Sequence, residues 1–136
     1  MNDSVSALFD AAVQVRQQAH APYSGFAVGA ALRAEDGRIY VGCNVENAAY
    51  PSGTCAEQAA IAAMIAGGAR KIEALAVVAD GLQPVTPCGA CRQRIREFAS
   101  NSTQIHAGNL AGAHRQFPFA DLLPESFGPE FLPERL

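Results

Sequence analysis

Three cysteines at two predicted helix starts limit most strongly what this chain can fold into. Cys55 precedes an Ala-rich helical stretch, and Cys88 and Cys91 open a second helical stretch. Because Cys88 and Cys91 are three residues apart, one helical turn places both thiols on the same face. A site that uses all three thiols therefore requires the starts of two separate helices to meet.

These thiols predict a catalytic metal site. A helix N-terminus presents unpaired N–H groups and a positive dipole, which favour the thiolate form that metals bind. Three thiolates without a fourth protein ligand leave one coordination position open, as in catalytic zinc sites. Zinc lowers the pKa of a water bound there, so that hydroxide exists near neutral pH. We therefore expect one Zn²⁺ per subunit, bound by Cys55, Cys88 and Cys91.

Glu57 is the candidate catalytic residue. It lies two residues after Cys55, too close along the same helix to be expected to point in the same direction, and it is not needed as a ligand. A carboxyl group beside an activated water can act as general base and then as general acid. The sequence therefore predicts that Glu57 moves protons during catalysis.

Two other interpretations of the cysteines compete with a catalytic zinc site. Cys88-x-x-Cys91 alone fits a redox dithiol or half of a structural zinc site. Cys43 is the only candidate fourth ligand, but it lies in a predicted strand, where we expect a small buried hydrophobic residue. A redox pair does not explain Glu57 near Cys55. Both alternatives are therefore less favoured than a catalytic site.

The pattern along the chain predicts a single α/β domain over residues 1–136. The order is helix, hairpin, helix, strand, helix and strand, which suggests a layered domain with a mixed sheet. We expect residues 72–79 to form a central strand covered on both faces and the helix over 55–66 to be buried. The expected elements are helices over 4–19 (capped by Asp3 or Ser4), 55–66 (capped by Thr54) and 88–99, strands over 26–32, 38–45, 72–79 and 104–107, and a helical turn over 121–124.

Composition and charge narrow the possible partners. The formal net charge is −3, which argues against binding to nucleic-acid backbones or anionic membranes. The first residues show no leader pattern, and the longest apolar stretch, 59–66, is too short to span a bilayer. We therefore expect a cytoplasmic protein, where cysteines are more often ligands or free thiols than disulfides.

At this point the chain resembles a known family, the small homotetrameric zinc-dependent cytidine deaminases of nucleoside salvage. Cys55-Ala56-Glu57 followed by Pro87-Cys88-x-x-Cys91 is the zinc deaminase signature and admits the whole superfamily. Asn44-x-Glu46-Asn47 and the tail narrow the resemblance to enzymes of free nucleosides. It implies a three-layer α/β/α sandwich with a mixed five-stranded sheet, and a homotetramer with active sites shared between subunits. The matching stretches are 23–32, 42–50, 55–57, 87–93 and 122–129.

The resemblance also implies how the sugar is bound. Asn44 and Glu46 would hydrogen-bond the ribose 3′-hydroxyl, as an amide and a carboxylate are able to do. Because a 2′-deoxy sugar keeps that hydroxyl, both cytidine and 2′-deoxycytidine are expected substrates. The alternative is that Asn44 and Glu46 only organise the loop that follows their strand.

The contacts to the base are likewise implied by the resemblance. Phe26 would pack on the base, the N–H of Ala56 would bind its carbonyl, and the carbonyl of Thr86 would accept from its amino group. Phe127 would reach the base from a neighbouring subunit, and Tyr50 would line a neighbour's site. The alternative for each aromatic residue is ordinary core or interface packing. His20, His106 and His114 match no ligand position and are expected to be structural or surface residues.

One departure from the family concerns charge. Many tetrameric members have Arg directly after the catalytic Glu, whereas this chain has Gln58. Three thiolates on Zn²⁺ leave a formal charge of about −1, which weakens zinc as a Lewis acid. We expect the two helix N-termini, helped by Arg92, to compensate. The loop Pro51-Ser52-Gly53 also differs from the commoner sequence there.

Three rival functions stay open. The first is a deaminase of the same fold acting on the nucleoside antibiotic blasticidin S or on modified cytosine nucleosides; Asn44, Glu46 and Phe127 favour cytidine instead. The second is a non-catalytic zinc module, which Glu57 argues against. The third is editing of polynucleotide bases, which the acidic charge balance disfavours.

Overall fold

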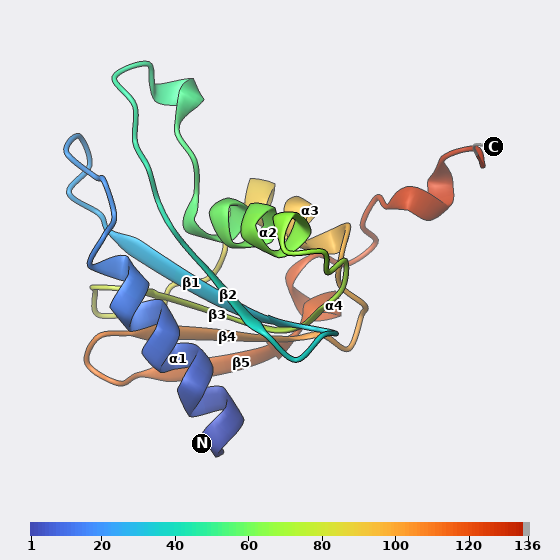
Figure 1. Cartoon of the computed structure of the whole chain (residues 1–136), viewed down its shortest axis with the longest axis horizontal. Helices are drawn as coiled ribbons and strands as arrows, with labels where there is room; N and C mark the ends of the chain where they lie inside the picture. Colours follow the sequence, from blue (N-terminus) through green and yellow to red (C-terminus); the bar gives the residue numbers. More distant parts are fainter. Residues whose placement is uncertain (135–136) are drawn as a thin grey trace.

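The computed structural model describes residues 1–134 (Figure 1). Its helices and strands follow the alternation expected for an α/β protein. The elements are α1 (Asp3–Arg16), β1 (Val28–Ala34), β2 (Ile39–Cys43), a 3₁₀ turn (Tyr50–Ser52), α2 (Ala56–Ala66), β3 (Ile72–Ala79), α3 (Gly89–Arg96), β4 (Gln104–Asn109), β5 (His114–Pro118), α4 (Phe119–Leu122) and a second 3₁₀ turn (Pro129–Phe131).

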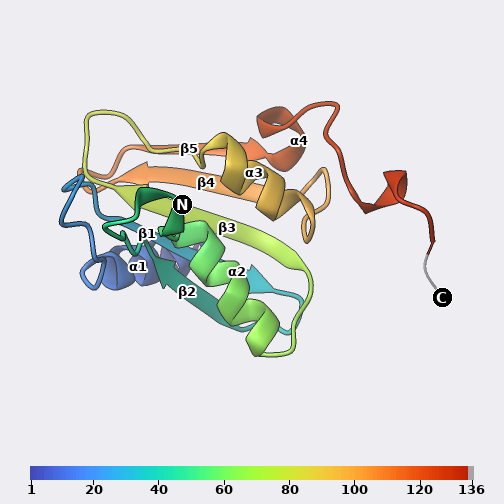
Figure 2. The same ribbon diagram turned by 90° about the horizontal axis from the view of Figure 1, so that it is seen from above.

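One mixed sheet organises these elements. The five strands lie in the order β2-β1-β3-β4-β5, and β3 and β4 are parallel while the other neighbours are antiparallel. Helix α1 covers one face, and α2 and α3 cover the other (Figures 1 and 2). The expected three-layer α/β/α arrangement with a mixed five-stranded sheet is therefore confirmed.

The central strand β3 takes part in both layers of the core. Leu75 and Val77 pack with residues of α2 and α3, whereas Ala76 and Val78 pack with Leu8 of α1. Successive side chains of a strand point to opposite faces, so a strand between two helical layers is apolar at every position. The bounds 72–79 and the central place predicted for this strand are confirmed.

A glycine fixes how closely α2 approaches the sheet. A Cβ at Gly42 would lie 2.5 Å from the carbonyl oxygen of Ala56 and 2.4 Å from the amide nitrogen of Ala60. The backbone of α2 can therefore rest directly on β2 only because this residue has no side chain. The close contact holds the first turn of α2, which follows Cys55, against the sheet.

Several expected helix ends were wrong, and hydrogen bonds explain them. Asn2, rather than Asp3 or Ser4, caps α1, since its side chain accepts from the amide of Val5 at 2.9 Å. Cys55 caps α2 instead of Thr54, whose backbone pairs with Val45 in an isolated bridge. Helix α3 ends at Arg96 rather than at residue 99, and the carbonyl of Phe98 accepts from the amide of Ile72 at 2.9 Å.

Other expected elements also differ. Strand β5 was not predicted from the sequence pattern, because His114, Arg115 and Gln116 make it polar at the edge of the sheet. Helix α2 is buried on one face only, and Ala62 and Ala66 are exposed in the single chain. The remaining differences are shifts of bounds: α1 spans 3–16 rather than 4–19, β1 spans 28–34, β2 spans 39–43, β4 extends to 109, and α4 covers 119–122.

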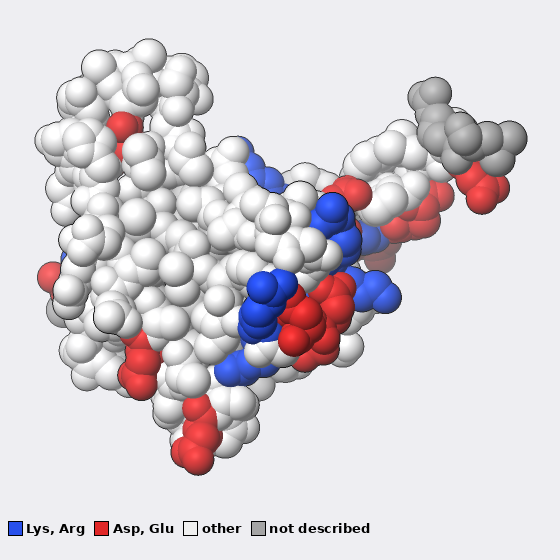
Figure 3. Space-filling model, in the orientation of Figure 1, with Lys and Arg blue, Asp and Glu red and all other residues white. Residues whose placement is uncertain are grey.

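The surface carries charges of both signs. On the face shown in Figure 3, Lys and Arg lie beside Asp and Glu, and no continuous basic strip is formed there by the residues that the structure describes. Across residues 1–134, no helix combines the length and apolar character needed to cross a bilayer.

Candidate metal and substrate site

The starts of α2 and α3 bring three thiols together. The sulfur atoms of Cys55, Cys88 and Cys91 all lie within 4.8 Å of one another. Cys55 is the N-cap of α2, Cys88 is the N-cap of α3, and Cys91 follows in the first turn of α3. The expected meeting of two helix starts is therefore present in the fold.

The donor set fits a zinc ion. Zinc–sulfur bonds are about 2.3 Å long, so sulfurs that share one tetrahedral zinc lie roughly 3.8 Å apart, within the spread of this cluster. Thiolates are soft ligands that favour zinc over calcium or magnesium. Cys43 lies outside the cluster, at the end of β2, and is half-buried rather than buried as expected. It does not complete a four-thiol structural site.

Glu57 lies in the same cleft as the thiols. Its side chain is buried, 5% exposed, and it lines the cleft together with Cys55 and Cys88. Glu57 lies outside the cluster of three sulfurs but lines the same cleft, a place compatible with the expected role beside the metal-bound water. Cys55 has the extended backbone of a cap (φ −78°, ψ 156°), so helical spacing does not set its direction relative to Glu57. Burial raises the pKa of the Glu57 carboxyl, which suits a group that exchanges protons near neutral pH.

Arg94 contacts the cluster and was missed from the sequence. Its Nη1 donates to the sulfur of Cys91 at 3.4 Å, and this hydrogen bond raises the pKa of the guanidinium further. Burial raises the pKa of the Cys91 thiol. A signal did exist: Arg94 is three residues after Cys91, and residues with that spacing share a helix face.

The two residues expected to support the thiols bond elsewhere. Arg92 donates to the carbonyls of Pro87 at 2.7 Å and Leu122 at 2.8 Å, and to the hydroxyl of Thr86 at 3.2 Å. None of these contacts goes to sulfur, because the guanidinium is bonded to these three oxygen atoms instead. The side chain of Gln58 accepts from the amide of Cys55 at 3.4 Å, so it acts on the cap and donates to no thiol, whereas the backbone amide of Gln58 donates to the Cys55 sulfur in a capping box.

A cleft beside Glu57 gathers most of the expected substrate contacts. It has a volume of about 290 Å³, close to the lower end of ordinary small-molecule pockets. Val77 of β3 and Val85 add apolar surface to it. The expected contact residues that line this cleft are Phe26, Asn44, Glu46, Ala56 and Thr86.

Asn44 also has a structural role. Its side-chain oxygen accepts from the amide of Val28 at 2.8 Å, and its side-chain nitrogen donates to the carbonyl of Phe26 at 2.8 Å. These bonds fix the backbone that enters β1. The loop-organising interpretation therefore holds for Asn44, whatever it binds besides.

Glu46 organises the neighbouring turn. Its carboxylate accepts from the amides of Tyr23 at 2.9 Å and Ser24 at 3.1 Å, and from the hydroxyl of Ser24. The hydrogen bond from the Ser24 hydroxyl lowers the pKa of Glu46, so the group is ionised at neutral pH. Glu46 is thus held as an acceptor at the rim of the cleft.

Tyr50 and Phe127 do not line this cleft within the same chain. Tyr50 lies in the first 3₁₀ turn, is 75% exposed and borders a separate hollow with Tyr23. Phe127 is 55% exposed and stacks on Phe131 at a ring distance of 5.6 Å. It belongs to the C-terminal segment that projects from the body of the molecule (Figures 1 and 2).

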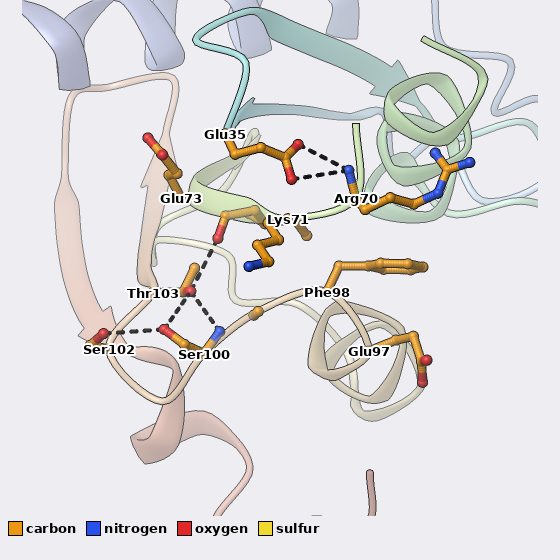
Figure 4. Close-up of a pocket in the computed structure, with 11 residues that line it drawn as sticks. Glu35, Arg70, Lys71, Glu73, Glu97, Phe98, Ser100, Ser102 and Thr103 are labelled. Carbon is orange, nitrogen blue, oxygen red and sulfur yellow. Dashed lines mark hydrogen bonds between the residues drawn. The ribbon is translucent and has the colours of Figure 1, made fainter. Parts of the chain in front are cut away.

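A second, larger cleft lies away from this chemistry (Figure 4). It has a volume of about 570 Å³ and is lined by Ile72 at the start of β3, whereas Val77, which lines the thiol cleft, is near the other end of the strand. Some of its polar groups bond one another: the carboxylate of Glu35 accepts from the amide of Arg70 at 3.0 Å, and the hydroxyl of Thr103 accepts from the amide of Ser100 at 2.9 Å. Size alone therefore does not identify the functional cleft here.

The comparison with known families identifies the class. A family model described as the cytidine and deoxycytidylate deaminase zinc-binding region matches residues 2–107. The match covers well over half of the chain and includes all three clustered cysteines and Glu57. The chain belongs to this family.

Individual relatives agree with that assignment. A cytidine deaminase from Sporosarcina psychrophila is 51% identical over 119 residues, which cover 88% of each chain. The crystal structure of cytidine deaminase from Burkholderia pseudomallei has a TM-score of 0.87 and 43% identity, and the match covers 93% of this chain and 100% of that one. The crystal structure of the Mycobacterium tuberculosis cytidine deaminase has a TM-score of 0.82 and 38% identity, covering 93% and 99%.

Proposed function

We propose that this chain is a cytidine deaminase that hydrolyses cytidine and 2′-deoxycytidine to uridine and 2′-deoxyuridine with release of ammonia. The observation that carries the proposal is the cluster of three thiols at two helix starts, with the buried carboxyl of Glu57 in the same cleft. The named relatives support the substrate class. Cys55, Cys88 and Cys91 would hold one zinc ion per chain.

Zinc, when bound, supplies Lewis-acid activation of the attacking water. Glu57 takes a proton from that water and delivers it to N3 of the ring, which makes C4 electrophilic. The water oxygen forms a bond to C4, and Glu57 then takes the second proton of that water from the new C4 hydroxyl group and passes it to the amino group, so that the C4 oxygen becomes the ring carbonyl as nitrogen departs. The C4–N bond breaks and nitrogen leaves as ammonia. The pKa of Glu57, raised by burial, suits these repeated transfers.

The substrate is oriented by residues around the cleft. Asn44 and Glu46 bind the 3′-hydroxyl of the sugar, and Phe26 packs on the base. The amide of Ala56 donates to the base carbonyl and the carbonyl of Thr86 accepts from the amino group. Support for these roles is that all five residues line the cleft that contains Glu57.

The enzyme acts as a cytoplasmic homotetramer with shared active sites. Tyr50 and Phe127 serve the cleft of a neighbouring subunit. The support is that both rings are largely exposed and outside the cleft of their own chain. Thiol ligands also need a compartment in which cysteines stay reduced.

Glu57→Gln tests the proposed chemistry. The variant should keep its fold and zinc content and lose about 10²- to 10⁴-fold in kcat, because Gln cannot carry the proton. Ammonia release from cytidine and metal content are the measurements. Near-normal turnover would contradict the role of Glu57. Blasticidin S, offered to the unchanged enzyme, distinguishes the rival substrate class.

A further inference from the structure

The proposed metal centre has an unbalanced charge. Three thiolates and one Zn²⁺ carry a formal charge of about −1, and Cys91 is 0% exposed. A buried negative charge is costly unless a cation or hydrogen-bond donors lie next to it. The residue after Glu57 is Gln58, whose side-chain oxygen accepts a hydrogen bond from the amide of Cys55. That side chain brings no positive charge.

Arg94 is placed to supply the missing charge. Its Nη1 lies 3.4 Å from the sulfur of Cys91, and the guanidinium is half-buried on the face of α3 that carries this thiol. Its charge also acts on the two other thiols, Cys55 and Cys88, and on the carboxyl of Glu57. The electrostatic attraction between a guanidinium and a thiolate is stronger beside a buried sulfur than it is in water.

The other arginines of α3 are engaged elsewhere. Arg92 donates to three oxygen atoms, two of them backbone carbonyls. Arg96 donates to the hydroxyl of Ser126 and pairs with Glu130 in the C-terminal segment. Among the arginines of α3, Arg94 is therefore the one that bonds a thiol.

We propose that Arg94 is a positioning residue of the metal centre, which donates a charged hydrogen bond to the thiolate of Cys91 and slows the loss of zinc. It acts through Cys91 and touches no substrate. By drawing electron density from sulfur it also keeps the metal a stronger Lewis acid. This inference rests on the proposed zinc site.

Zinc release from the holoenzyme tests the inference directly. Arg94→Gln should release zinc to a colorimetric chelator about 10- to 100-fold faster than the unchanged protein, the range measured when partners of metal ligands are removed. Arg94→Lys should recover part of the difference, because it keeps the charge but not the planar guanidinium. Arg115→Gln removes an exposed charge on β5 and should release zinc at the original rate.

A charge swap distinguishes electrostatics from packing. Gln58→Arg combined with Arg94→Gln returns one cation to the cluster from α2, and should restore slow zinc release. The same variants loaded with Co²⁺ should show the sulfur-to-cobalt absorption band moving in Arg94→Gln and returning in the double variant. If Arg94→Gln is poorly folded, the double variant and Arg94→Lys, each compared with the unchanged protein, give the same test.

The outcomes separate this inference from the proposed function. Unchanged zinc release and cobalt spectra in folded Arg94→Gln would overturn the role of Arg94 and leave the deaminase proposal standing. Fast release that neither Arg94→Lys nor the swap corrects would also overturn it, since the defect would then be one of packing. An unchanged protein that binds zinc but releases no ammonia from cytidine would refute the function alone.

Discussion

The two halves of the proposed active site are built in different ways. The proposed metal half lies at the starts of α2 and α3, where Cys91 is 0% and Glu57 is 5% exposed. The residues proposed for the substrate half lie in loops and in the C-terminal segment, where Phe26 is 45%, Phe127 is 55% and Tyr50 is 75% exposed. One half is part of the core, and the other presents aromatic rings to solvent.

This difference separates what one chain can do from what an assembly adds. The thiols and Glu57 are held by the same packing that stabilises the sheet, so a single chain contains a complete metal half. An aromatic ring exposed to water contributes no hydrophobic stabilisation, and it stabilises a complex only when a partner surface buries it. Mutations in the metal half should therefore affect chemistry directly, whereas those in the outer half should affect substrate binding.

The largest effect is expected from the metal half. Cys91→Ala should reduce bound zinc from about one per chain to nearly none and abolish ammonia release, because two thiols do not hold zinc as three do. Cys43→Ala is the matched control, since this half-buried cysteine lies outside the cluster, and it should keep both zinc and activity. Full zinc content in Cys91→Ala would contradict the assignment of Cys91 to the metal half of the site.

Glu46→Gln should have an intermediate effect. A hydrogen bond to a charged group contributes roughly 1.5–3 kcal/mol, so kcat/KM for cytidine should fall on the order of 10- to 100-fold. Glu46 also holds Tyr23 and Ser24, and 3′-deoxycytidine separates the two roles. If Glu46 binds the 3′-hydroxyl, the penalty nearly vanishes on that substrate. An equal penalty on both substrates would leave Glu46 a loop-organising residue only.

Phe127→Ala tests whether the outer half is completed by a neighbour. The expected result is a rise in KM of about tenfold, or roughly 1.4 kcal/mol, with little change in kcat or zinc content. Leu82→Ala is the control, because Leu82 is 96% exposed and lines neither half of the site. Sizing chromatography of both variants shows whether assembly is kept. An unchanged KM in an intact assembly argues against the role of Phe127.

The smallest effect is expected on the opposite face of the sheet. His106 is buried there beside Phe9 of α1, and burial, followed by the nearby His114, lowers its pKa below the ordinary 6.5. The native state then binds fewer protons than the unfolded state, so the free energy of unfolding falls as pH drops below about 6.5.

His106→Asn should flatten this pH dependence without changing kcat at neutral pH. Denaturant unfolding at several pH values measures the slope, and His20→Asn is the control outside the sheet. An equal slope in His106→Asn and the unchanged protein would assign the acid sensitivity to other groups.

Much of the architecture could be predicted because its signals are local. The run over 72–79, apolar except at Glu73, predicted β3, and the cysteine spacing predicted two helix starts. Strand β5 gave no such signal, since an edge strand that is solvated on one side can be polar. The ends of α2 and α3 were missed because they depend on hydrogen bonds to distant residues, such as that between Ile72 and Phe98.

The arginine that hydrogen-bonds a thiol is a clearer example of what the sequence could not predict. Arg92 was expected to help balance the thiolate charge, yet Arg94 is the residue that bonds a thiol. Arg92 lies four residues after Cys88 and Arg94 lies three residues after Cys91, so helical spacing alone allowed either arginine to face a thiol. The spacing was visible in the sequence. The sequence did not show that Arg92 donates to the carbonyls of Pro87 and Leu122, because only the folded chain brings the Leu122 carbonyl within reach.

The sequence by itself determined the groups that we propose to react: the three thiols, the carboxyl of Glu57 and the helices that present them. Their chemistry follows from residue type and short spacing, which a linear chain already contains. The tertiary structure decided which cation meets the sulfur, how deeply Glu57 is buried and which aromatic rings stay exposed. These depend on how closely separate elements pack, as at Gly42, where the absence of one side chain lets α2 rest on the sheet.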